Sequence, residues 1–65
     1  MIKAGQTVVS RDGAFTGVTT GAHYKCSLEG CTGHRVVVRW ADKKITRPCS
    51  KGMVFDEKTN TWTIL

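Results

Sequence analysis

The sequence predicts an all-β fold, a closed or nearly closed small barrel of five or six short antiparallel strands. β-Branched residues are spread through the whole chain, and no stretch keeps the 3.6-residue period of an amphipathic helix. The seven glycines fall mostly between short β-prone runs, which is how turns separate the strands of an all-β protein. Closing such short strands into a barrel is one way for a small sheet to avoid unpaired edges.

Residues 6–10 and 15–20 are expected to form the first two strands. The dipeptide Asp12-Gly13 between them is a strong turn signal. Gly17 interrupts the second run, and Gly21 ends it. A loop of residues 21–34 then follows, which is long for so small a chain.

The clearest strand signal lies at residues 35–40. Alternation places Val36, Val38 and Trp40 on one face of this strand. A hairpin is expected here, with its return strand at residues 44–47. If residues 42–43 form a two-residue loop, Trp40 lies opposite Ile45. Pro48 ends that strand because it has no N–H to donate. Runs at 53–55 and 61–65 predict a last hairpin.

Two segments resemble known families of small barrels. Gly5-Gln6-Thr7-Val8-Val9, then Asp12-Gly13 and Gly17-Val18, is similar to the opening of KOW-type and related SH3-like barrels. Val38-Arg39-Trp40-Ala41-Asp42 followed by Lys44-Ile45 is similar to the central hairpin of Tudor-like barrels. This resemblance implies an SH3-like barrel. The loop of residues 21–34 departs from those families, and a zinc-ribbon-like sheet is the alternative fold.

Length and composition limit what the chain can do. We expect 65 residues to form one domain, 1–65, whose core gives little net stability. A chain of this size has no room for a deep substrate chamber, so we expect neither an enzyme nor a small-molecule substrate. The longest apolar run is 36–38, too short for a membrane span or a signal peptide. The expected location is therefore the cytoplasm, with no membrane partner.

Cysteine and histidine concentrate in the loop. Cys26, Cys31 and His34 follow one another with four and two intervening residues. Cys49 comes just after the return strand, and in an antiparallel pair a residue near 49 lies opposite residue 35 or 36. Three thiolates and one imidazole are a donor set of structural zinc sites. The sequence therefore predicts one structural Zn²⁺ held by Cys26, Cys31, His34 and Cys49.

Other interpretations of these residues remain open. His23 could replace His34 as the fourth ligand, or it could lie outside the site. The paired Cys-x₂-Cys pattern typical of zinc sites is absent, so free surface thiols or a Cys26–Cys31 disulfide are alternatives. Glu29 is the only acidic residue in the loop, which argues against a catalytic zinc with a general base.

Positive charge concentrates in one segment. Residues 35–51 hold six basic residues against one acidic residue, a net charge of +5 that equals that of the whole chain. Phosphate backbones are the commonest partners of such a stretch. The predicted nucleic-acid-binding residues are Arg35, Arg39, Lys43, Lys44, Arg47 and Lys51.

These observations together predict a small accessory or regulatory protein that binds nucleic acid through a basic hairpin. Of the aromatic residues, Tyr24 and Phe15 are the candidates for exposed stacking, whereas Trp40 and Trp62 are expected in the core. A zinc-stabilised adaptor or inhibitor that docks on an acidic protein surface is the alternative. The simplest alternative is that the basic residues only face solvent and bind no partner.

Overall fold

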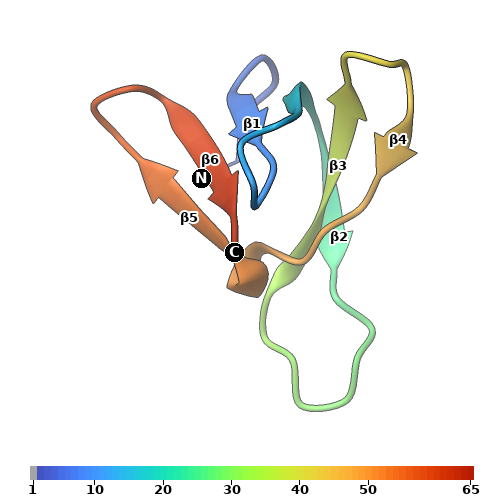
Figure 1. Cartoon of the computed structure of the whole chain (residues 1–65). Helices are drawn as coiled ribbons and strands as arrows, with labels where there is room; N and C mark the ends of the chain where they lie inside the picture. Colours follow the sequence, from blue (N-terminus) through green and yellow to red (C-terminus); the bar gives the residue numbers. More distant parts are fainter. Residues whose placement is uncertain (1) are drawn as a thin grey trace.

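Six strands and one short 3₁₀ helix make up the computed structural model, which describes residues 2–65 (Figure 1). The strands are β1 (Thr7–Val9), β2 (Thr16–Lys25), β3 (His34–Trp40), β4 (Ile45–Thr46), β5 (Met53–Asp56) and β6 (Thr61–Ile64), with the 3₁₀ helix η1 at Ser50–Gly52. They form one sheet in the order β4-β3-β2-β1-β6-β5. The predicted all-β class is confirmed, and the SH3-like barrel stays a prediction.

One pairing differs from the prediction of antiparallel strands throughout. β1 and β6 are parallel, with Thr7 opposite Thr61 and Val9 opposite Thr63. The predicted last hairpin does form, since β5 and β6 pair antiparallel. Its inner strand lies beside β1, at the centre of the sheet, and the sheet is therefore mixed.

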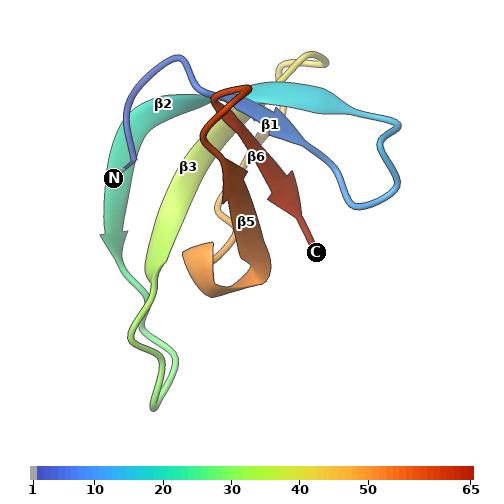
Figure 2. The ribbon, with the colours of Figure 1, turned by 90° about the vertical axis from the view of Figure 1, so that its left-hand side faces the viewer.

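The sheet curls around a small apolar core. Val8 of β1, Val36 and Val38 of β3, and Met53 of β5 are buried against one another. These strands are not neighbours in the sheet, so their side chains meet only because the sheet bends around them. Both tryptophans pack against this cluster, as predicted. In Figure 2 the connection between β2 and β3 projects away from the rest of the sheet.

β2 is longer than predicted and continues past Gly21 to Lys25. Gly21 has a φ of +89° and lies within an irregular stretch of the β2–β3 pairing, between Thr19 and His23. Beyond it the pairing resumes, so the expected loop of residues 21–34 is shorter, and residues 26–33 connect the strands. Glycine marks a bend within a strand here, and not its end.

The hairpin between β3 and β4 is shifted by one residue from its predicted register. Ile45 lies opposite Arg39, not Trp40, because the loop has three residues and Lys43 takes a positive φ of 72°. Type I turns followed by a left-handed residue form such loops. The shift moves Ile45 to the outer face, where it is 44% exposed.

Candidate metal centre

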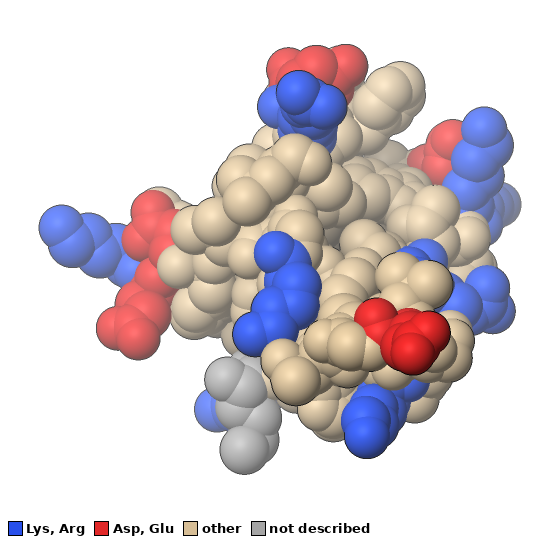
Figure 3. Space-filling view, turned by 90° about the horizontal axis from the view of Figure 1, so that it is seen from below, with Lys and Arg blue, Asp and Glu red and all other residues tan. Residues whose placement is uncertain are grey.

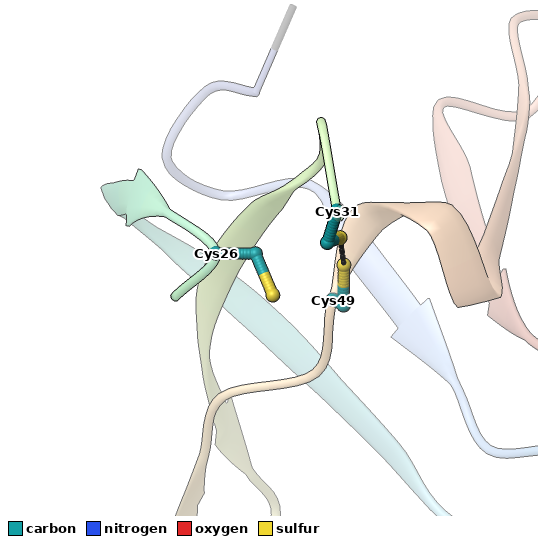
Figure 4. Close-up of side chains that lie close together, drawn as sticks. All are labelled: Cys26, Cys31 and Cys49. Atoms are coloured by element: carbon teal, nitrogen blue, oxygen red, sulfur yellow. Dashed lines mark hydrogen bonds between the residues drawn. The ribbon is translucent and has the colours of Figure 1, made fainter. Parts of the chain in front are cut away.

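Three cysteines from separate parts of the chain meet beside the connection between β2 and β3 (Figure 4). Cys26 follows β2 directly, Cys31 lies in the connection, and Cys49 precedes η1. Their Sγ atoms all lie within 4.8 Å of one another, and those of Cys31 and Cys49 are 3.5 Å apart. The residues that the structure describes thus include a compact group of three soft donor atoms.

Strand pairing brings Cys49 to this group. Arg35 and Cys49 form an antiparallel bridge, and the N–H of Val36 donates to the carbonyl of Pro48 at 2.9 Å. This bridge continues the register of the pair between Arg39 and Ile45, so the chain follows β3 from β4 as far as Cys49. The pairing predicted for Cys49 from the sequence is confirmed.

Gly33 allows the connection to approach Cys49 closely. It is buried, and a Cβ atom at this position would lie 2.9 Å from Cys49 Sγ and 2.7 Å from Lys51 Cγ. Its carbonyl accepts a hydrogen bond of 3.0 Å from the N–H of Cys26, which closes the connection. Glycine is therefore needed here for space beside a sulfur atom.

Two of the cysteine sulfurs accept a hydrogen bond from a backbone N–H group. The N–H of Leu28 donates to Cys26 and that of Gly33 to Cys31, in each case two residues beyond the cysteine. The hydrogen bond from Leu28 holds the pKa of Cys26 below its usual range, aided by the other two thiols and by the charge of Arg35. A lowered pKa reduces the free energy needed to deprotonate Cys26 when it binds a metal ion.

The pKa of Cys31 is shifted in the opposite direction, above its usual range. The N–H of Gly33 favours its thiolate, but the sulfur atoms of Cys26 and Cys49, together with burial, raise its pKa. Three adjacent thiols cannot all lose their protons without a cation, because each negative charge opposes the next. A bound metal ion removes this conflict, since a thiol that coordinates a metal is deprotonated.

His34 lies outside this group of donor atoms. Its neighbour Arg35 pairs with both Tyr24 and Cys49, so these side chains share one face of the sheet and His34 points to the other. Nδ1 of His34 is 3.4 Å from Nδ1 of His23. Of the four predicted ligands, the structure brings together the three cysteines and does not bring His34 to them.

The spacing of the sulfur atoms fits one tetrahedral ion. Two sulfurs bound to Zn²⁺ at ~2.3 Å lie about 3.8 Å apart, and the Cys31–Cys49 separation is 3.5 Å. The cysteines are free, and the 3.5 Å separation is far beyond the ~2.05 Å of a disulfide. The three cysteines could therefore hold a metal ion.

The predicted basic residues lie along β3, β4 and the segments that follow them. Arg39, between exposed Val18 and Ile45 in the pairing, is on the outer face. Arg35 is half-buried, and its guanidinium donates to the carbonyl of Arg47 at 3.1 Å. Nζ of Lys44 lies 3.8 Å from Oδ2 of Asp42. Figure 3 shows the basic side chains interspersed with acidic side chains and uncharged surface, so the view from below contains no continuous basic patch.

Some features of the site were not predicted from the sequence. The N–H donors of Leu28 and Gly33 and the charge of Arg35 beside Cys26 belong to the site as much as the sulfurs do. Gly33, two residues after Cys31, is a sequence signal for its own N–H donor alone, and nothing in the sequence pointed to Leu28.

Two further findings concern membrane helices and the comparison with known proteins. Within residues 2–65 we find no helix with the length and apolar character needed to cross a membrane. Comparison with protein-family models, curated proteins and solved structures finds no match to this chain.

Proposed function

We propose that the chain is a non-catalytic, cytoplasmic β-domain stabilised by one zinc ion, and that it binds nucleic acid through its basic hairpin. The observation that carries the zinc proposal is the approach of three cysteine sulfurs to within 4.8 Å of one another. Thiolates favour zinc over harder cations such as Mg²⁺ or Ca²⁺. We propose Cys26, Cys31 and Cys49 as its ligands.

Zinc would connect parts of the chain that have little apolar contact. Cys31 and Cys49 are 18 residues apart in sequence, and Leu28 in the connection is 60% exposed. Structural zinc sites contribute on the order of 10 kcal/mol to folding, which is large beside the stability of a small core. Zinc would therefore fix the β2–β3 connection against Cys49.

Metal analysis of the purified protein tests this proposal. We expect one zinc per chain in the wild type and none in Cys49→Ser, and we expect a strong chelator to lower the melting temperature of the wild type. A metal-free wild type that unfolds cooperatively would contradict it.

The variant His34→Ala decides the fourth ligand. Since His34 points away from the sulfurs, we expect this variant to keep its zinc, with solvent at the fourth position. Loss of the zinc would mean that His34 turns toward the ion, as the sequence alone predicted.

The outer face of β2, β3 and β4 supports nucleic-acid binding. It combines the basic side chains of Arg35 and Arg39 with Tyr24, which is 48% exposed and directly opposite Arg35. Guanidinium groups bind phosphates, and an exposed aromatic ring can stack on an unpaired base.

Fluorescence polarisation with labelled single-stranded and duplex oligonucleotides tests this second part. We expect Arg39→Gln and Lys44→Gln each to weaken binding and to reduce the slope of log K against log salt by about 1. Lys58→Gln is the matched control, because Lys58 is exposed but lies outside the basic stretch. The absence of binding at low salt would overturn this part and leave the zinc proposal intact.

A surface pocket favours the second candidate, a protein-docking adaptor. It has a volume of about 230 Å³ and is lined by Phe15, Trp40, Ala41, Asp42, Lys44 and Thr46. Phe15 is 61% exposed there. If the chain docks on a protein, a defined partner should still be recovered after nuclease treatment, and Phe15→Ala should abolish its recovery while Arg39→Gln should not.

A further inference from the structure

The two histidines of the chain face each other across neighbouring strands. His23 of β2 lies opposite Val36 in the pairing, and His34 of β3 lies opposite Lys25, so the two histidines are diagonal neighbours. Both side chains are exposed. Their rings meet edge to face at 67°, with centroids 5.3 Å apart and Nδ1 atoms 3.4 Å apart.

This separation suits a shared metal ion better than a direct hydrogen bond. Good N–H hydrogen bonds in proteins join atoms about 2.7–3.2 Å apart, and 3.4 Å is beyond that range. Two nitrogens that bind one tetrahedral zinc at ~2.0–2.1 Å lie about 3.3–3.4 Å apart. The two rings therefore already have the spacing that coordination requires.

The histidine pair is separate from the cysteine group. Cys49 and Tyr24 pair with Arg35, whereas His34 is the next residue of β3 and points to the opposite face. The β2–β3 hairpin thus carries three sulfur donors beside one face and two nitrogen donors on the other.

We propose that His23 and His34 form a second metal site for a divalent cation that favours imidazole, such as Zn²⁺. Two protein ligands leave the remaining coordination positions to solvent, so this site binds more weakly than the cysteines and exchanges its ion readily. The proposal does not depend on nucleic-acid binding. It requires only that His34 is not a ligand of the cysteine site.

Lys25 opposes a cation here. It pairs directly with His34, lies on the same face and is exposed. A positive charge and a divalent cation about 8 Å apart in water repel each other. Removing the charge of Lys25 therefore strengthens binding of the ion about two- to fivefold at moderate salt. The variant Lys25→Met is therefore expected to tighten zinc binding at the histidine pair by this factor.

Calorimetric titration with Zn²⁺ tests the proposal, starting from protein that already holds one zinc per chain. We expect a second, weaker binding event in the wild type, accompanied by shifts of the ring signals of both histidines in NMR spectra. His23→Gln and His34→Gln should each abolish the second event and keep the first zinc. Tyr24→Phe, a change on the opposite face of β2, should keep both.

Two results would overturn the proposal. One is a wild type that takes up no second zinc. The other is a His34→Gln protein that loses the first zinc, since His34 would then belong to the cysteine site. Retention of the first zinc in the variants also shows that they are folded, so loss of the second event reports on the histidines alone.

Discussion

The two ends of the molecule are held together by different means. At the core end, Val8, Val36 and Val38 are fully buried, with Met53 nearly so, and both tryptophans pack against them. At the cysteine end, only Cys26 and Gly33 are buried among residues 26–33. Apolar burial therefore orders one end, whereas the other end is held by strand pairing and backbone hydrogen bonds, with the three sulfurs beside them.

This difference shows how a small chain can extend beyond what its core supports. The connection between β2 and β3 projects from the sheet and has a largely exposed sequence (Figure 2). A second apolar core would need more residues than the chain has. A metal ion held by the three cysteines, as proposed above, would serve this purpose with fewer residues. Substitutions at the two ends should consequently have separable effects.

The largest effect is expected from Cys26→Ser. It removes a buried sulfur of the proposed zinc site, whose ligation contributes on the order of 10 kcal/mol. We expect no bound zinc and fast hydrogen exchange of the Cys26 and His34 amides, with protection kept at Val8 and Val38. Equal loss of protection at both ends would show that the core end does not fold independently of the site.

Val38→Ala is the corresponding change at the core end. Truncation of this fully buried side chain should lower the free energy of unfolding by on the order of 2 kcal/mol, measured by denaturant titration. Zinc stoichiometry should stay at that of the wild type. Val54→Ala is the control, because Val54 is 51% exposed and its truncation should cost under about 0.5 kcal/mol.

Gly33→Ala tests the close approach at the cysteine end. The new methyl group would lie 2.9 Å from Cys49 Sγ, so the connection must move away from Cys49. We expect a loss of about 1–3 kcal/mol in stability and weaker zinc binding in a competition titration against a chelator. Gly52→Ala has open space around its new Cβ atom and should leave zinc affinity unchanged.

The smallest effect is expected at the turn after β1. Ala14 N–H and Ser10 Oγ donate to Asp12 at 3.0 and 2.7 Å and lower its pKa below the usual value of 3.8. A lowered pKa in the folded state stabilises the protein above the unfolded pKa, and this contribution is lost as the pH falls through the lower pKa of the folded state. Asp12→Asn should therefore lower the urea midpoint slightly at pH 7, and the difference from the wild type should shrink as the pH is lowered into the acidic range. A difference that does not change with pH would assign the effect to hydrogen bonding alone.

Much of the fold and part of the site could be predicted from the sequence. The alternation of residues 35–40 correctly placed Val36 and Val38 in the core, and antiparallel arithmetic correctly placed Cys49 beside Arg35. Both rest on the two-residue period of a strand, which any L-residue chain must follow.

Two of the errors come from backbone conformations that the residue types do not reveal. Lys43 takes a left-handed conformation, which adds one residue to the hairpin loop and moves Ile45 to the outer face. Gly21 bends β2 without ending it. His34 was predicted as a ligand from its position in the sequence; in the structure it lies beside His23 and is not part of the three-cysteine group, and its role stays a prediction.

The position of β6 in the sheet determines the order in which the two ends can form. All three cysteines precede residue 50, whereas β1 gains its second neighbour only when Thr61–Ile64 have been synthesised. During vectorial synthesis the three cysteines would therefore leave the ribosome before β6, and so before the parallel β1–β6 pair exists. If the cysteines bind zinc as proposed, the ion would bind while the core is still incomplete. The loop that the ion closes would then leave fewer conformations for β6 to search before it pairs with β1.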